Sequence, residues 1–86
     1  MSQVSETKPL GRKELVALAI LRAIEHHHIR AVDILAIDVK EYVFRNQKEL
    51  DVIIYLRGSP IYIEVHLDKN GNIKRSHIGW INPKEA

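Results

Sequence analysis

The chain has 86 residues, and its 13 Lys and Arg against 11 Asp and Glu leave a formal net charge of only +2. This length accommodates one small domain, and the lack of cysteine excludes disulfides and thiolate metal sites. No apolar run is long enough to cross a bilayer, and the polar start of the chain lacks the pattern of a signal peptide. We therefore expect a cytoplasmic protein that does not contact membranes.

A helix is predicted over residues 10 to about 30, with Gly11 as its N-cap and Glu14 at the positive end of the helix dipole. Helical spacing places an apolar set on one face: Val16, Ala17, Ile20, Ala23, Ile24 and His27. Leu15 and Leu18 fall on the opposite, nominally polar side. The helix therefore has either a wide contact with a sheet or a second surface that meets another subunit.

Three consecutive histidines, His26 to His28, close this helix. Neighbouring residues of a helix point about 100° apart, so the three rings cannot converge on one ion, which needs spacings of three or four residues. We expect no metal site here, and a role of the histidines at the negative end of the helix dipole.

A first strand is predicted from about Ile34 to Phe44, where Leu35, Ile37 and Val39 alternate with polar or small residues. Tyr42 and Phe44 have the opposite parity. This change predicts either a bulge near Lys40 or an aromatic outer face. The polar residues 45–49 are expected to form the turn that follows.

The strongest pattern is a hairpin over residues 50–67. Two runs each alternate aliphatic side chains with mixed ones, on either side of a turn over residues 57–60 that contains Gly58 and Pro60. One aliphatic set has even numbers and the other odd numbers, so the numbers of facing residues must add to an odd value. The predicted aliphatic pairs are Leu50 with Leu67, Val52 with Val65, and Ile54 with Ile63. The predicted outer pairs are Asp51 with His66, Ile53 with Glu64, and Tyr55 with Tyr62.

A second hairpin turn is predicted at residues 68–72, because Gly71 can adopt positive φ, and Ile73 then faces Leu67. Strict alternation in the last strand, residues 73–81, would put Arg75 and His77 on the core face. Either this strand is a peripheral edge, or a bulge exchanges its faces midway. Both alternatives stay open at this point.

Together these elements predict an α+β fold in which one N-terminal helix packs on one face of a four-stranded antiparallel β-meander. The domain is expected to span residues 10–81, between a disordered N-terminal tail over residues 1–9 and a C-terminal tail over 82–86. The segment Ile-Tyr-Ile-Glu-Val-His-Leu-Asp-Lys-Asn-Gly-Asn-Ile, over residues 61–73, together with the preceding helix and strands, resembles PepSY-type domains. That resemblance implies the same order of elements and a regulatory or inhibitory role.

No catalytic site, cofactor or small-molecule substrate is expected. The best constellation for acid–base chemistry is Asp51, His66 and His77 on the outer face, where a cross-strand Asp–His pair could tune a base. An exposed ion pair of little energetic value is the more common role of such residues. The sequence contains no glycine-rich phosphate loop.

The outer face carries more aromatic and isoleucine side chains than a solvated strand face requires. We expect it, or the outer side of the helix, to bind a protein partner or a second copy of the chain. The residues expected to make this contact are Ile53, Tyr55, Tyr62, Ile78 and Trp80.

The alternative function is binding of single-stranded DNA or RNA, in which sheet tyrosines stack on bases and cations contact phosphates. The residues for that function are Tyr55, Tyr62, Arg57, Lys40 and Lys74. The small net charge places this alternative second.

Overall fold

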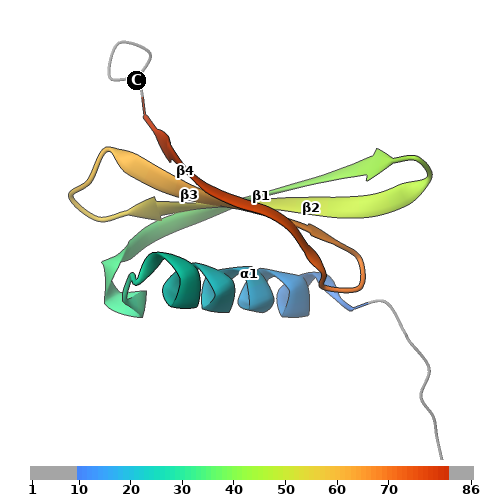
Figure 1. The fold of residues 1–86 in the computed structure, drawn as a ribbon, viewed down its shortest axis with the longest axis horizontal. Helices are drawn as coiled ribbons and strands as arrows, with labels where there is room; N and C mark the ends of the chain where they lie inside the picture. Colours follow the sequence, from blue (N-terminus) through green and yellow to red (C-terminus); the bar gives the residue numbers. More distant parts are fainter. Residues whose placement is uncertain (1–9, 82–86) are drawn as a thin grey trace, which may run out of the picture.

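A computed structural model describes residues 10–81 of the chain as one helix packed against a twisted antiparallel sheet (Figure 1). The elements in chain order are α1 (Arg12–His27), a 3-10 turn (Ala31–Asp33), β1 (Ile34–Phe44), β2 (Gln47–Leu56), β3 (Ile61–Asp68) and β4 (Ile73–Trp80). The strands lie in the order β1-β2-β3-β4. The predicted α+β fold with a four-stranded meander is therefore confirmed. The tails predicted at residues 1–9 and 82–86 lie outside the described residues.

The start of α1 is fixed by its N-cap. The backbone N–H of Gly11 donates to Glu14 Oε1 over 2.6 Å, which satisfies one of the N–H groups that a helix start leaves free. The Glu14 carboxylate also lies at the positive end of the helix dipole. The helix ends at His27, and His28 adopts the left-handed conformation with φ of 57°. The predicted cap is confirmed, whereas the predicted helix extends a few residues too far at its C-terminal end.

The buried face of α1 differs from the predicted one. Leu15, Ala19 and Ala23 are its buried residues, whereas Ala17, predicted to face the sheet, is exposed. Placing Leu15 on the polar side was therefore wrong. Ala19 and Ala23 are small and spaced by one turn, so the helix backbone can lie close to the sheet along this line.

The three histidines at the end of α1 do not act together. His27 Nε2 lies 2.9 Å from Ser76 Oγ in β4, while His26 and His28 are exposed. Burial, and then the charges of the neighbouring histidines, lower the pKa of His27, which favours a neutral ring in this hydrogen bond. Among residues 10–81, no group of three or more His, Asp or Glu side chains is arranged to hold a metal ion.

The β1–β2 hairpin closes more tightly than predicted. Arg45 and Asn46 have φ of 52° and 63°, and two successive residues with positive φ are typical of a two-residue hairpin turn whose twist matches the strands. The predicted turn over residues 45–49 is therefore wrong, because β2 already begins at Gln47. Glu49 consequently belongs to a strand and not to a loop.

The register of β1 decides between the two predicted alternatives. The pairing with β2 is regular from Ala36 to Phe44, and its irregularity lies at Leu35. No bulge therefore occurs near Lys40. Tyr42 and Phe44 lie on the sheet face that points away from α1, which we call the outer face.

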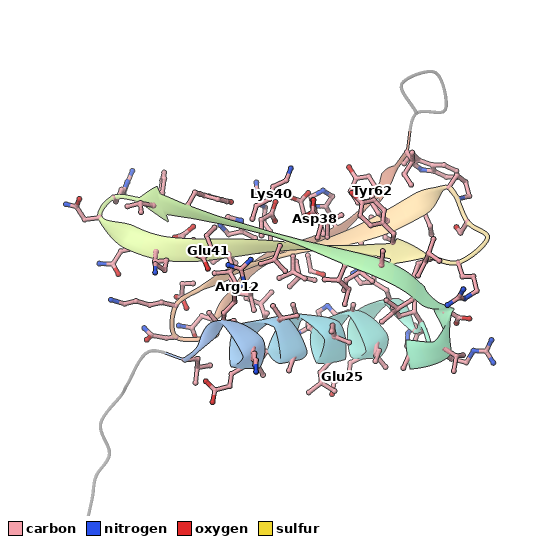
Figure 2. All side chains as sticks on the ribbon, turned by 180° about the vertical axis from the view of Figure 1, so that it is seen from behind. Arg12, Glu25, Asp38, Lys40, Glu41 and Tyr62 are labelled. Atoms are coloured by element: carbon pink, nitrogen blue, oxygen red, sulfur yellow. The ribbon has the colours of Figure 1, made fainter. Side chains whose placement is uncertain are left out.

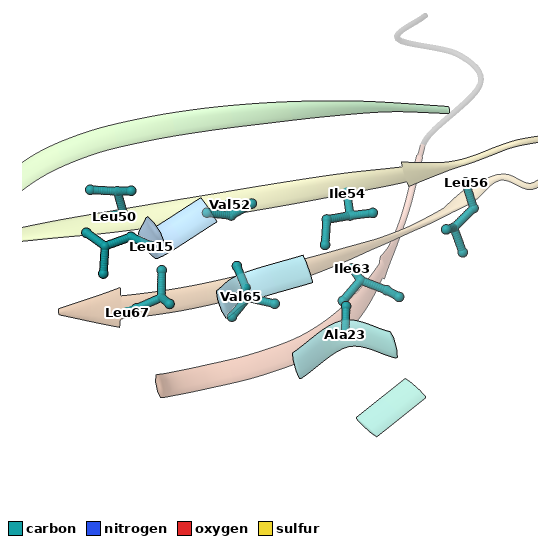
Figure 3. Close-up of a cluster of buried hydrophobic side chains, with 10 residues drawn as sticks. Leu15, Ala23, Leu50, Val52, Ile54, Leu56, Ile63, Val65 and Leu67 are labelled. Atoms are coloured by element: carbon teal, nitrogen blue, oxygen red, sulfur yellow. The ribbon is translucent and has the colours of Figure 1, made fainter. Parts of the chain in front are cut away.

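The predicted register of β2 and β3 is confirmed at every pair: Leu50 with Leu67, Asp51 with His66, Val52 with Val65, Ile53 with Glu64, Ile54 with Ile63, and Tyr55 with Tyr62. The three pairs made of two aliphatic residues face α1, on what we call the helix-side face. They are almost completely buried and form the core with Leu15, Ala19 and Ala23 (Figure 3). Burial of large aliphatic side chains is the dominant favourable contribution to folding in a domain of this size.

The last strand contains the bulge that the sequence left open. Leu67 pairs with Ile73, as predicted, but His66 pairs with Arg75, so Lys74 is an extra residue in β4. This residue exchanges the two faces of the strand beyond it. Arg75 therefore lies on the outer face instead of in the core.

Because the bulge exchanges the faces of β4, part of the predicted contact face is wrong. Ile78 pairs with Ile63, and Trp80 pairs with Ile61, so both side chains lie on the helix-side face. Tyr55 and Tyr62 lie on the outer face. The predicted patch of Ile53, Tyr55, Tyr62, Ile78 and Trp80 is therefore divided between opposite sides of the sheet.

The β3–β4 turn also holds the start of the helix. Asp68 Oδ1 accepts hydrogen bonds from the N–H groups of Asn70 and Asn72, over 2.9 and 3.0 Å. The N–H of Leu10 donates to the carbonyl oxygen of Lys69 over 3.0 Å. Gly71 has the predicted positive φ, of 89°. A Cβ atom at Gly71 would lie 2.8 Å from Leu18 Cδ1 and 2.9 Å from Leu10 Cδ1.

We predict that Gly71→Ala lowers the free energy of unfolding by roughly 2–4 kcal/mol, through backbone strain together with a clash against two leucines. Gly58→Ala is the matched control, because Gly58 also has positive φ, of 69°, but no atom lies within 4 Å of its Cβ position. Strain alone should cost this variant about 1 kcal/mol. Denaturant unfolding measures both values, and equal losses would contradict the packing of this turn against the start of α1.

Candidate functional site

Charged and polar side chains gather in the middle of the outer face, although no helix covers that side. We call them the polar cluster; they come from all four strands and comprise Tyr42, Glu49, Asp51, Glu64, His66 and Lys74. Glu49, Asp51 and His66 are only 4%, 8% and 7% exposed. Burial of charged groups is costly unless they are paired and hydrogen-bonded. The hydrogen-bond and ion-pair partners of each group therefore determine how far the cost of burying it is offset.

Glu49 is the best-paired member of the polar cluster. Its Oε1 lies 2.6 Å from His66 Nε2, and its Oε2 accepts a hydrogen bond from Lys74 Nζ over 3.1 Å. The bond to His66, followed by the bond to Lys74, lowers the pKa of Glu49. The bulge in β4 brings Lys74 to this position, so the same irregularity that exchanges the faces of β4 also supplies a cation to a buried carboxylate.

Tyr42 covers the imidazole of His66. Its hydroxyl lies 2.6 Å from Nδ1 of His66, and the two ring centroids are 5.3 Å apart. Burial, and then the nearby carboxylates, raise the pKa of Tyr42, so its hydroxyl keeps its proton. The Tyr42 hydroxyl can donate a hydrogen bond to Nδ1 of His66, while the N–H at Nε2 of the same ring donates to Glu49 Oε1.

Asp51 is the least satisfied member. Its Oδ1 is buried and makes no hydrogen bond within the described part of the chain, and it lies 3.7 Å from His66 Nδ1. Burial, and then the Glu64 carboxylate, raise the pKa of Asp51 to about 6. The hydrogen bond from Asp51 lowers the pKa of Glu64, so the proton of this pair resides on Asp51. Glu64 Oε1 in turn lies 3.1 Å from His77 Nε2.

The predicted constellation of Asp51, His66 and His77 is thus brought together through Glu64. Asp51 and His66 are buried, whereas His77 is exposed. Sequence reasoning missed Glu49, because it placed this residue in a turn. It also missed Tyr42, because the alternation of β1 does not show that this side chain extends across β2 to contact His66 in β3. Lys74 was predicted as a nucleic-acid contact, but its bond to Glu49 was missed because Glu49 had been placed in a turn.

An open pocket of about 450 Å³ lies beside the polar cluster. Its lining residues are Tyr42, Phe44, Glu49, His66, Lys74 and Arg75. The groups present can exchange protons, since a histidine, a carboxylate and a phenol are in contact. Within residues 10–81 the two serines lie elsewhere: Ser59 is in the β2–β3 turn, and Ser76 bonds to His27 on the helix-side face. The cluster therefore offers acid–base groups but no hydroxyl nucleophile of serine.

The tyrosines of the predicted contact face lie at one end of the outer face. The rings of Tyr55 and Tyr62 have centroids 6.2 Å apart, and Ile53, in the next row, is partly buried. The Tyr62 ring occupies the space that a Cβ atom at Gly79 would need. Part of this ring therefore covers strand backbone and is not free to stack on a ligand.

The cations predicted to contact nucleic acid are spread over the outer face and its turns. Arg57 lies in the β2–β3 turn, Lys40 faces Asp51 across the β1–β2 pairing, and Lys74 is bonded to Glu49. Figure 2 shows Lys40 with Asp38 and Tyr62 on the side of the sheet away from α1. These cations alternate with carboxylates and do not form a continuous positive groove.

A second feature lies on the helix-side face. The helix packs mainly on β2 and β3, so apolar side chains of the two outer strands remain uncovered. Ile37 and Val43 of β1, which we call the β1 margin, are 37% and 68% exposed. Ile78 and Trp80 of β4, which we call the β4 margin, are 48% and 72% exposed.

The raised pKa of Asp51 gives a testable pH dependence. A proton on Asp51 stabilises the fold fully below its ordinary pKa of 3.8, and this contribution is lost as the pH rises through about 6. We predict that Asp51→Asn, whose amide can donate to Glu64 as the protonated acid does, is more stable than the natural protein at pH 7. The gain should be on the order of 1–2 kcal/mol and should shrink toward pH 4.

Denaturant unfolding across this pH range measures the gain. Glu25→Gln is the matched control, because Glu25 is an exposed carboxylate on α1 and its replacement should leave stability nearly unchanged. An Asp51→Asn variant that is less stable than the natural protein at pH 7 would show that the ionised carboxylate stabilises the fold, contrary to this prediction.

No protein-family model, curated protein or solved structure matches this chain. The resemblance to PepSY-type domains therefore rests on the hairpin over residues 61–73 and the order of the elements. Within residues 10–81, no helix is long and apolar enough to cross a membrane.

Proposed function

We propose that the protein is a small non-catalytic interaction module that binds a protein surface, and that a second copy of the chain is the first partner to test. The single observation that carries the proposal is the uncovered apolar surface on both sides of α1. In a monomer these side chains would remain in water at an energetic cost that a partner removes.

Trp80 and Ile78 illustrate the size of this surface. They are neighbours on one face of β4, and both are largely exposed. A tryptophan contributes a large contact area to an interface and is enriched among the residues that dominate binding energy. The margin on β1 presents two further aliphatic side chains in the same plane, Ile37 and Val43.

The charge of the chain also favours association with a protein. A formal net charge of +2 gives two copies little electrostatic reason to repel each other. The same small charge supports weak binding to a polyanion, which usually needs a concentrated basic surface. Nucleic acid therefore remains the second alternative, with Tyr55, Tyr62, Arg57, Lys40 and Lys74 as its contacts.

The polar cluster supports a structural more than a catalytic role. Its carboxylates and histidine are bonded mainly to one another, and the pocket beside them is open to solvent. Catalysis usually requires acid–base groups that are free to meet a substrate in a site from which water is excluded.

We predict that the natural protein self-associates with increasing concentration and that Ile37→Ser with Val43→Ser weakens association, because each change replaces exposed apolar surface with a hydroxyl. Ile78→Ser with Trp80→Ser tests the β4 margin in the same way, and the comparison identifies which margin makes the contact. Sedimentation equilibrium from micromolar to millimolar concentration measures the effect.

Leu21→Ser is the matched control, since Leu21 is an exposed apolar residue on the side of α1 away from the sheet. It should leave association unchanged if the margins make the contact. A particle mass of one chain at every concentration would contradict the proposal in its self-associating form. Loss of association in Leu21→Ser alone would place the contact on the outer side of the helix.

A further inference from the structure

β1 is an open edge of the sheet. It runs for 11 residues, from Ile34 to Phe44, contains no proline, and is exposed over nearly all of its length. Among the strands of residues 10–81, it pairs with β2 on one side only. A row of backbone N–H and C=O groups therefore points away from the sheet, as in strands that pair with another chain.

β4 is the other edge, and it is poorly suited to pairing with itself. Its charged and titratable residues are all basic: Lys74, Arg75 and His77. Antiparallel pairing of two β4 strands would bring these basic side chains close to one another, and like charges repel. The bulge at Lys74 also interrupts the ladder on this strand. Of the two edges, only β1 has mixed charges.

The symmetry of a dimer restricts how β1 can pair with its own copy. Antiparallel pairing of two identical strands requires a two-fold axis perpendicular to the sheet, and such an axis keeps both helices on the same face. Directly opposed residues must then come from the same face of the two copies. The numbers of opposed residues must therefore add to an even value, so the axis passes through one residue of β1.

We propose that two copies pair through β1 in the register centred on Val39, which forms one continuous eight-stranded antiparallel sheet. Asp38 then faces Lys40 of the second copy, and Lys40 faces Asp38 of the second copy. Both residues are exposed on the outer face, where opposite charges on facing strands attract. This inference rests on the proposed function and specifies its partner and its contact.

The neighbouring registers lack this complementarity. An axis through Asp38 would oppose two aspartates, and an axis through Lys40 would oppose two lysines. An axis through Glu41 would oppose two carboxylates on the helix-side face. Like charges directly opposite each other destabilise a strand pair, so the charge pattern selects Val39.

The apolar side chains of β1 gain contacts in the same register. Ile37 lies diagonal to Val39 and Val43 of the second copy, within reach of a side-chain contact. Directly opposite Ile37 lies Glu41 of the second copy, whose carboxylate is already paired with Arg12 Nη1 of its own helix at 2.7 Å. Side chains of the second copy therefore cover part of the β1 margin, on the helix-side face between the two helices of the dimer.

The register is tested by a charge exchange. Asp38→Lys should place two lysines against each other at two symmetric positions, because position 38 faces Lys40 of the second copy, and should weaken dimerisation roughly tenfold. Lys40→Asp should weaken it similarly. The double variant, with both substitutions, restores opposite charges only in the Val39 register and should recover natural affinity. Because Lys40 also faces Asp51 in its own chain, unfolding of each variant is measured alongside sedimentation.

Cross-linking provides a second test that does not depend on charge. The chain contains no cysteine, so Val39→Cys introduces a single thiol at the proposed axis. Opposed Cα atoms of antiparallel strands are about 4.5–5.5 Å apart, within the range that a disulfide spans. Mild oxidation should give a covalent dimer of Val39→Cys, whereas Asp38→Cys and Ile78→Cys should give far less.

The outcomes separate this inference from the proposed function. A natural protein that associates, together with cross-linking at position 39 and rescue by the double exchange, supports both. Association without rescue and without cross-linking at 39 overturns the β1 register and leaves the interaction module, with its contact elsewhere. Covalent dimers formed mainly by Asp38→Cys or Ile78→Cys also overturn it. A monomer at every concentration overturns the β1 dimer.

Discussion

One helix covers only about half the width of a four-stranded sheet, and the main features of this protein follow from that constraint. Adjacent strands lie about 4.8 Å apart, and a helix with its side chains is about 10 Å wide. The helix therefore covers β2 and β3 and leaves the margins on the helix-side face of β1 and β4 exposed to water. The chain buries its largest aliphatic side chains under α1 but cannot cover the margins with any other described element.

The two faces of the sheet deal with burial differently. On the helix-side face, aliphatic rows pack on Ala19 and Ala23, so a flat and close contact forms. On the outer face, side chains bury one another without a covering helix, because Tyr42 leans across β2 and covers His66. Glu49 and Lys74 form an ion pair, whereas Asp51 carries a proton below about pH 6 and donates it in a hydrogen bond to Glu64. The polar cluster thus replaces a second apolar layer while its middle remains nearly closed to water.

The central hairpin could be predicted because its constraint is strong. A slip by one residue would move one of the two aliphatic rows from the core to the solvent, so the parity of the two rows specifies the register. The turn at Gly71 was predicted for a similar reason, since positive φ strongly favours glycine. The N-cap at Gly11 followed from the position of Glu14.

The remaining features depend on interactions that a linear pattern does not contain. Strict alternation cannot locate the bulge at Lys74, which moves Ile78 and Trp80 to the face opposite the tyrosines. The tight turn at Arg45 and Asn46 was missed because neither residue is glycine. The buried face of α1 was misjudged because alanine, not leucine or isoleucine, marks its centre. Each of these depends on a three-dimensional fit between elements.

Backbone hydrogen exchange, followed residue by residue at low and high protein concentration, tests most directly how the uncovered sheet is completed. We predict slow exchange in β2 and β3 at both concentrations, because their amides lie inside the sheet. At high concentration the amides of β1 that point away from β2 should become protected, while those on the free side of β4 stay fast. Protection that appears on β4 and not on β1, or β2 amides that exchange as fast as the edges, would contradict this description of the molecule.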